Sequence, residues 1–151
     1  MALRIFKPKY QIFIICIGIT MVMTLNGQNL DKYQWKNRIV LIISSDSESD
    51  TFTAQIEAFD INSRELEERK LLIYRVLTDK YKIENTKDTS WIKDSKLYAT
   101  YNPTDKNFSI VLIGLDGNVK TEQSNLLTAT ALFSIIDAMP MRRNEIRDNK
   151  K

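Results

Sequence analysis

The feature that most constrains the fold is an unbroken apolar run at Ile39–Ile43, made only of Ile, Val and Leu. An alternating pattern would indicate a strand with one solvated face. A short, β-branched run with no polar position is instead typical of a strand buried on both faces, as in a parallel sheet with helices above and below. The run therefore predicts an α/β fold.

A helix is expected directly after this strand. Ser49 or Asp50 is its predicted N-cap, and Phe52, Ile56 and Phe59 repeat at helical spacing. The helix is expected to continue through two opposite-charge pairs four residues apart, which are Arg64–Glu68 and Glu65–Arg69.

A second strand is predicted at Leu71–Leu77. Strand, helix and strand at this spacing form a right-handed βαβ unit with parallel strands. Residues 78–107 are polar and give a weaker signal. We expect one short helix there, from Ser90 to Tyr101, ended by Asn102-Pro103.

The last third of the chain predicts a hairpin and a helix. Strands are expected at Phe108–Ile113 and at Val119–Glu122, joined by a turn at Asp116-Gly117. Thr128 is the expected cap of a final helix, which presents Leu132, Ile135, Ile136 and Met139 to the sheet and stops at Pro140; residues 144–151 are charged and expected to fray. The order β-α-β-α-β-β-α is that of the thioredoxin fold.

The N-terminus has the pattern of a signal peptide. Arg4, Lys7 and Lys9 precede an apolar run from Ile12 to Leu25, which is shorter than the ~20 residues of a spanning helix. Cleavage after Gly27 gives a signal over residues 1–27, a thioredoxin-like domain over 28–147 and a disordered tail over 148–151. The expected location is the periplasm or the exterior, with no membrane contact after cleavage. The alternative is a membrane anchor formed by an uncleaved N-terminal helix.

Charge and composition narrow the function. The three basic residues of the predicted signal account for the whole formal charge of +3, so a cleaved chain is neutral and lacks the basic excess that nucleic-acid binding needs. The chain has no histidine, and its one cysteine, Cys16, lies in the predicted signal. Thiol redox chemistry is therefore excluded for the cleaved domain. The usual ligands of zinc, haem and iron–sulfur sites are also missing, and we expect no cofactor.

Three stretches together resemble one family. They are Tyr33–Arg38, Val111–Gly117 and Ile136–Arg143, and over most of its length the chain is similar to the family known as domain of unknown function 4174. The resemblance implies an exported domain with a thioredoxin-like fold, closest to peroxiredoxins. It carries no catalytic residue across, and we expect none.

The loop between the first strand and the first helix is where a redox-active thioredoxin keeps its reactive thiolate, because the helix N-terminus lowers its pKa. Here that loop is rich in serine and carboxylates and includes Asp46, Glu48 and Asp50. One interpretation is a solvated capping loop, and another is a general acid or base in a carboxylate-dependent enzyme. A third is a calcium loop completed by Glu57, although Thr51 stands where such a loop needs glycine.

Aromatic and basic residues suggest a binding surface elsewhere. Trp91, Tyr98 and Tyr101 lie in the polar segment and either form a binding patch or fold inward over the sheet. Arg142 and Arg143 either complement the dipole of the last helix or bind an anion or a partner. The leading hypothesis is an exported, non-redox domain that binds a protein partner or supports the cell envelope.

Overall fold

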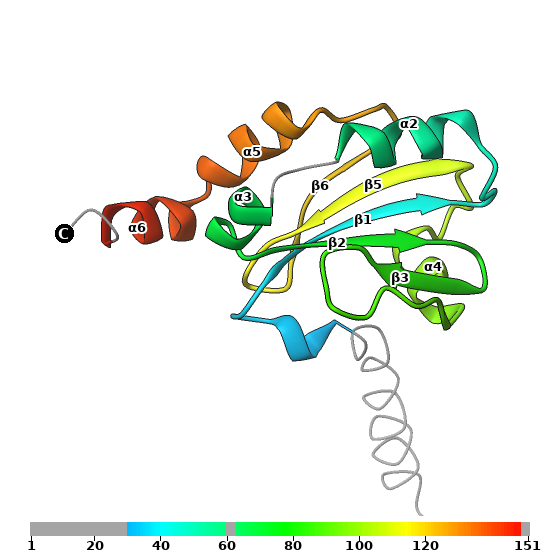
Figure 1. Cartoon of the computed structure of the whole chain (residues 1–151), viewed down its shortest axis with the longest axis horizontal. Helices are drawn as coiled ribbons and strands as arrows, with labels where there is room; N and C mark the ends of the chain where they lie inside the picture. Colours follow the sequence, from blue (N-terminus) through cyan, green and yellow to red (C-terminus); the bar gives the residue numbers. More distant parts are fainter. Residues whose placement is uncertain (1–29, 60–62, 149–151) are drawn as a thin grey trace, which may run out of the picture.

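A computed structural model describes residues 30–59 and 63–148 (Figure 1). Over these residues six strands form one mixed sheet in the order β4-β3-β2-β1-β5-β6. The strands are β1 (Arg38–Ser44), β2 (Leu71–Val76), β3 (Lys80–Ile83), β4 (Ile92–Lys93), β5 (Phe108–Ile113) and β6 (Val119–Gln123). The helices are the 3₁₀ turn η1 (Asp31–Tyr33), α2 (Asp50–Ala58), α3 (Ser63–Glu68), α4 (Lys96–Tyr101), α5 (Ala129–Asp137) and α6 (Pro140–Asp148).

Strand β1 lies inside the sheet, as its apolar run predicts. All seven of its residues are buried. It pairs in parallel with β2 on one side and antiparallel with β5 on the other, so neither of its edges is free. The α/β class, the parallel β1–β2 pair and the antiparallel β5–β6 hairpin are confirmed.

Each face of the sheet carries its own hydrophobic core. Helices α2, α3 and α5 cover one face, and their contacts with the even-numbered residues of β1 include Phe52, Leu66, Leu132 and Ile136. The other face packs its odd-numbered residues against α4 and a group of aromatic rings that includes Tyr74, Tyr81 and Tyr98. Alternation along β1 therefore decides which helices each residue meets.

The segment 78–107 differs from its prediction. A single helix from Ser90 to Tyr101 is wrong, because Ile92–Lys93 is a strand and the helix begins only at Lys96. The side chain of Asp94 accepts a hydrogen bond from the Lys96 backbone N–H at 2.7 Å, which fixes the start of α4. Strand β3, absent from the prediction, pairs with the outer edge of β2.

The expected extension of α2 is replaced by a separate helix, α3. The Arg64–Glu68 pair forms at 3.4 Å, as predicted. Arg69 reaches only the backbone oxygen of Glu65, at 3.2 Å, because its guanidinium donates a 2.7 Å hydrogen bond to Asp137 on α5. A tertiary ion pair has thus replaced a local one.

The C-terminal end is also more ordered than predicted. Helix α5 begins at the predicted cap, where the Thr128 hydroxyl accepts a hydrogen bond from Ala131 N at 3.2 Å. Pro140 does not end the chain's helical part but is the first residue of α6, a position that suits proline because its missing N–H would have no partner there. Residues 144–148, expected to fray, belong to α6.

Two predictions lie outside the described residues: the signal segment with Cys16, and the last three residues of the tail. Across the described ranges, no helix is both long and apolar enough to cross a membrane.

Candidate functional site

The loop after β1 is closed on itself. Ser44 is buried, and its hydroxyl lies 2.7 Å from the backbone oxygen of Asp46 and 3.2 Å from that of Asn107, both possible acceptors. The same oxygen accepts from Asp46 N at 3.1 Å. The Asp46 carboxylate in turn accepts from Glu48 N at 2.9 Å, an Asx turn. The loop's polar groups therefore mainly stabilise its own backbone.

The three carboxylates predicted as a candidate site, Asp46, Glu48 and Asp50, have exposed side chains. Ser49 occupies the N-cap position of α2, as predicted, but its side chain makes no capping hydrogen bond. Among the described residues, no group of three or more acidic, His or Cys side chains is arranged to hold a metal ion.

The three aromatic residues predicted as a patch do not act together. Tyr98 is buried in the core, and its hydroxyl donates a 2.7 Å hydrogen bond to Asp105. Tyr101 is half-buried and packs against the same core. For these two residues, the inward alternative is the one observed. Trp91 is different, because 42% of its surface is exposed.

Trp91 lies beside two lysines of the neighbouring strand. The ammonium groups of Lys80 and Lys82 lie 5.2 and 5.4 Å from the centre of its ring, within the range of cation–π attraction. Lys80 is directly opposite Lys93 in the antiparallel β3–β4 pair. Trp91, Lys80, Lys82 and Lys93, here called the basic edge, form a positively charged aromatic surface at one end of the sheet.

A groove adjoins the basic edge on the α2 side of the sheet. Its volume is about 430 Å³. Ile42 and Ile73 lie on the strands, while Ile56, Phe59 and Leu66 come from α2, the residue after it and α3. The apolar part therefore lies between the sheet and these two helices, and the polar lining residues are Glu57, Arg75, Glu84 and Asn85.

The polar rim of the groove is connected to the basic edge. Arg75 Nε lies 2.7 Å from Glu84 Oε1, and its Nη2 donates to Oε2 at 2.9 Å. Lys82 Nζ, which faces Trp91, contacts the same carboxylate at 2.9 Å. One acidic side chain thus holds two basic ones in position between the groove and Trp91.

Asn85 fixes the end of this rim. Its side chain accepts a hydrogen bond from Ile73 N at 2.9 Å and donates one to Leu71 O at 2.7 Å. It takes the place of a strand residue where β3 has already ended, so the backbone groups at the β2 edge are hydrogen-bonded without another strand.

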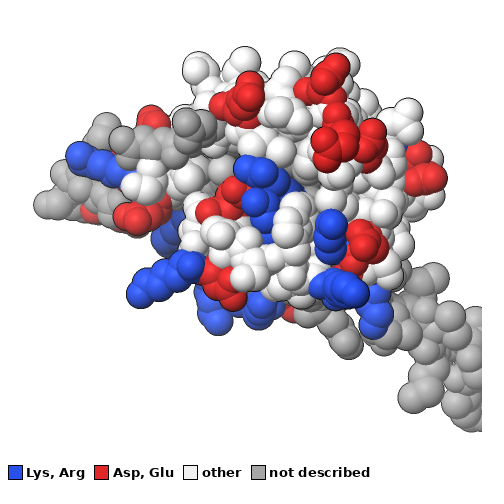
Figure 2. Space-filling model, turned by 45° about the vertical axis from the view of Figure 1, so that its right-hand side comes forward, with Lys and Arg blue, Asp and Glu red and all other residues white. Residues whose placement is uncertain are grey.

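In Figure 2, acidic side chains gather toward the top, where α2 lies, and basic ones lower down.

The two arginines predicted as a binding surface have separate environments. Arg143 is exposed, whereas Arg142 is buried. Arg142 Nε donates to Asp137 Oδ1 at 3.1 Å, and its Nη1 donates to Glu68 O at 2.6 Å. Burial opposes ionisation of Asp137, but hydrogen bonds from Arg69 and Arg142 outweigh it and lower the pKa of its carboxyl.

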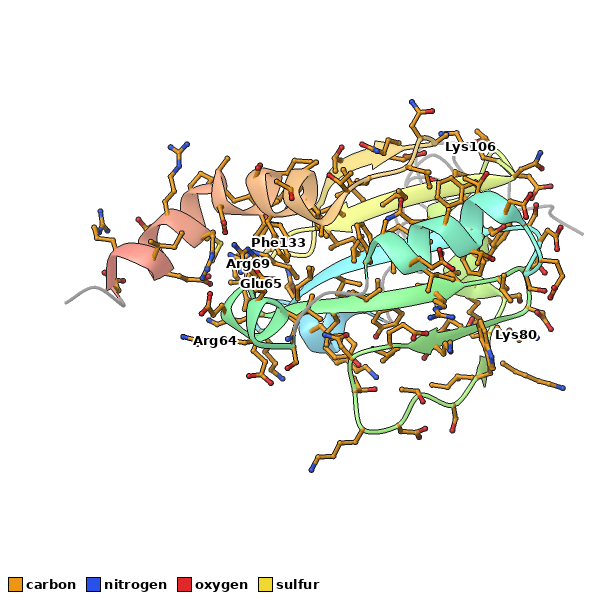
Figure 3. All side chains as sticks on the ribbon, turned by 45° about the horizontal axis from the view of Figure 1, so that its top comes forward. Arg64, Glu65, Arg69, Lys80, Lys106 and Phe133 are labelled. Carbon is orange, nitrogen blue, oxygen red and sulfur yellow. The ribbon has the colours of Figure 1, made fainter. Side chains whose placement is uncertain are left out.

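Arg69 completes this arginine cluster. Its guanidinium carbon lies 3.9 Å from the centre of the Phe133 ring on α5. Figure 3 shows Arg69 and Phe133 together near α3, with Lys80 at the other end of the molecule. The arginine cluster and the basic edge are therefore two different sites.

The sequence pointed to Trp91 but not to its lysine neighbours, because β3 and β4 were not predicted. A basic–aromatic alternation at residues 80–82, before a polar turn, was the signal that could have found β3.

Comparison with known proteins gives a family. A search of the solved structures found no match to this chain. The model of the family described as "Domain of unknown function (DUF4174)" matches residues 29–145, which is most of the chain and includes the groove, the basic edge and the arginine cluster. The chain therefore belongs to the DUF4174 family.

Proposed function

We propose that this protein is an exported, thioredoxin-like binding module without thiol chemistry, and that it holds an extended, acidic segment of a protein partner. The thioredoxin-like part is supported by the parallel β1–β2 unit with helices between its strands, followed by the β5–β6 hairpin and α5. Export is supported by the N-terminal pattern of Arg4, Lys7 and Lys9 ahead of an apolar run.

The observation that carries the proposal is the gathering of three lysines on the basic edge beside Trp91. Like charges directly opposite each other in an antiparallel pair are destabilising, and Lys80 faces Lys93. Attraction to the Trp91 ring offsets part of this repulsion, by about 0.5–1 kcal/mol for each exposed cation–π contact. A carboxylate-bearing partner would remove the rest.

The geometry of the edge favours an extended segment. Strand β4 is at one end of the sheet order, so no strand of the described residues neighbours its outer side. An edge strand offers unpaired N–H and C=O groups, and a peptide that adds to it gains main-chain hydrogen bonds. The lysines would then contact acidic side chains, while Trp91 and Ile92, both exposed, would contact apolar ones.

The groove gives such a segment an anchor. Its walls of Ile56, Phe59 and Leu66 suit an apolar side chain. The Arg75–Glu84–Lys82 chain of contacts joins this anchor point to Trp91. One partner segment would therefore place an apolar side chain in the groove and carboxylates on the basic edge.

Trp91 provides a direct test. The chain has two tryptophans, so the Trp35→Phe variant leaves Trp91 as the only one. The probe is a synthetic peptide that alternates valine with glutamate, and its control alternates valine with lysine. The acidic peptide should change the Trp91 fluorescence with saturation, and added salt should weaken the binding.

Two variants separate specific from general effects. Lys80→Glu should reduce the affinity for the acidic peptide at least about tenfold, because it removes one attraction and adds one repulsion. Lys106→Glu is the matched control, since Lys106 is exposed but pairs with Glu122 on β6, at the other edge of the sheet. Equal binding of both peptides, or equal loss in the two variants, would refute the proposal.

A further inference from the structure

A second site lies at the opposite end of β1 and does not depend on the groove. Arg38, the first residue of β1, is 0% exposed. Its Nη1 donates to Arg69 O at 2.9 Å and to Glu145 Oε2 at 3.2 Å. Its Nε and Nη2 are buried and have no hydrogen-bond partner within residues 30–59 and 63–148. Buried polar groups are nearly always paired, so an unpaired guanidinium edge requires an explanation.

Nearby carboxylates do not fully neutralise the positive charge around Arg38. In the part of the chain that the structure describes, Arg38, Arg69, Lys70 and Arg142 form ion pairs with two acidic side chains, Asp137 and Glu145. Four cations and two anions leave an excess of two positive charges among these residues. A guanidinium stays charged at any ordinary pH, so Arg38 cannot relieve the excess by losing a proton.

A pocket adjoins Arg38. It has a volume of about 210 Å³, and its lining is mostly apolar: Arg38, Leu115, Asp116, Lys120, Met139, Pro140 and Met141. These residues come from the start of β1, the β5–β6 hairpin and the junction of α5 with α6. Three separate parts of the chain thus enclose the space beside Arg38.

The other charges of the lining are already paired. Lys120 Nζ lies 2.7 Å from Asp116 Oδ2. The side chain of Lys120 passes over Gly114 so closely that a Cβ there would collide with its Cε. Hydrogen bonds from Lys120 and Asn118 lower the pKa of Asp116 to about 2, so its carboxylate stays ionised and balances Lys120. Arg38 is the lining cation with donors to spare.

We propose that this pocket binds a small organic monocarboxylate with a short apolar chain. The Nε and Nη2 edge of a guanidinium offers two parallel N–H groups, which match the two oxygens of one carboxylate. The chain of the acid would lie against Leu115, Met139 and Met141. Helix α6, whose first residues line the pocket, adds the partial positive charge of a helix N-terminus. A doubly charged anion fits less well, because the lining also holds the Asp116 carboxylate.

The test compares an acid with its amide on the full-length chain. The probes are 4-methylpentanoate and 4-methylpentanamide, which have nearly the same shape. The signal is the Arg38 Nε–H resonance in a ¹H–¹⁵N spectrum, which should move downfield when a carboxylate accepts its hydrogen. The acid should bind at least about tenfold more tightly than the amide.

A variant that fills the pocket from an exposed position tests binding without disturbing the buried ion pairs that stabilise the fold. Arg38→Lys removes the paired N–H edge but also disturbs Glu145. Met141→Trp instead fills the pocket from a position that is 39% exposed, and Leu126→Trp, 51% exposed and outside the lining, is its control. Met141→Trp should lose at least about tenfold in affinity and Leu126→Trp none. The proposal is overturned if acid and amide bind alike, if the resonance does not move, or if Met141→Trp binds as well as the unaltered protein.

Discussion

Gln55 connects α2 to the loop before α5 through two hydrogen bonds. The side chain is fully buried. Its Nε2 donates to Leu127 O at 2.8 Å, and its Oε1 accepts from Leu127 N at 2.8 Å. It thus satisfies both backbone groups of a buried residue 72 positions away. We predict that Gln55→Leu, which keeps most of the volume and removes both partners, destabilises the protein strongly.

The magnitude follows from the two groups that the substitution leaves unpaired. Each buried N–H or C=O without a partner costs about 1–3 kcal/mol. Burial of the added apolar surface returns about 1 kcal/mol. The expected loss is therefore about 1–5 kcal/mol, a large part of the 5–15 kcal/mol that typically stabilises a domain. The expected fall in Tm is roughly 4–20 °C at ~4 °C per kcal/mol.

Urea unfolding followed by circular dichroism measures this free energy. Gln123→Leu is the matched control, because Gln123 also donates to a backbone oxygen, that of Asn125 at 2.9 Å, but the hydrogen bond is exposed and the residue only half-buried. The control should lose less than about 0.5 kcal/mol. If Gln55→Leu loses no more than Gln123→Leu, the buried pair of hydrogen bonds does not stabilise the loop, and the reasoning fails.

Three further predictions concern charged and aromatic residues. Arg142→Met should cost about 1–3 kcal/mol in urea unfolding, because it removes the donor that a buried guanidinium gives to Glu68 O and one of the two arginine partners of Asp137. Arg143→Met, at an exposed position, should cost less than about 0.5 kcal/mol, and similar losses in the two variants would contradict the cluster. The pKa of Asp116 in the folded protein should be about 2 in a carbon-detected NMR titration and should rise in Lys120→Met. Since folding lowers this pKa, the contribution of Asp116 to stability is present above pH ~4 and is lost as the pH falls toward 2. A folded-state pKa near the ordinary value of an aspartate would refute the contacts with Lys120 and Asn118. Burial and the hydrogen bond to Asp105 raise the pKa of Tyr98, so its contribution to stability is complete below pH ~10 and is lost only as the pH rises further. Tyr98→Phe should lower the free energy of unfolding by about 1 kcal/mol at pH 7, measured by urea unfolding. No change in this free energy would show that the hydrogen bond contributes nothing to stability.

The main strands could be predicted because their residues alternate or run apolar over five or more positions. Ile39–Ile43 has one structural solution, a strand covered on both sides, and β1 adopts it. The Thr128 cap followed from local chemistry alone. Such signals depend on neighbours along the chain, which a sequence displays directly.

The rest depends on contacts between distant residues. Strand β4 has two residues, too few for any periodic pattern, and it exists because β3 pairs with it. Proline is compatible both with the end of one helix and with the first residue of the next, so the local sequence cannot assign Pro140 to either. The packing of α6 decides that Pro140 begins a helix. The sequence offered Arg142 either as a cation at a helix end or as a site for an anion or a partner, but contacts with residues 68 and 137 bury it.

The candidate sites also combine residues that local sequence indicates with contacts that only the fold creates. Trp91 stood out as an aromatic residue in a polar segment, yet its lysine neighbours required the β3–β4 register. Arg38 stood out only as the end of the stretch Tyr33–Arg38. Its unpaired edge and adjoining pocket arise from three elements that the sequence places far apart.

The bond between Arg38 and Glu145 also bears on when the chain can fold. These two residues are 107 positions apart, so β1 gains its acidic partner only after nearly all of the domain has been synthesised. Until then the guanidinium must remain hydrated, which disfavours burial of the start of β1. Contacts this remote in sequence slow folding as well. A nascent chain of this kind would stay unfolded for longer, until the last helix docks.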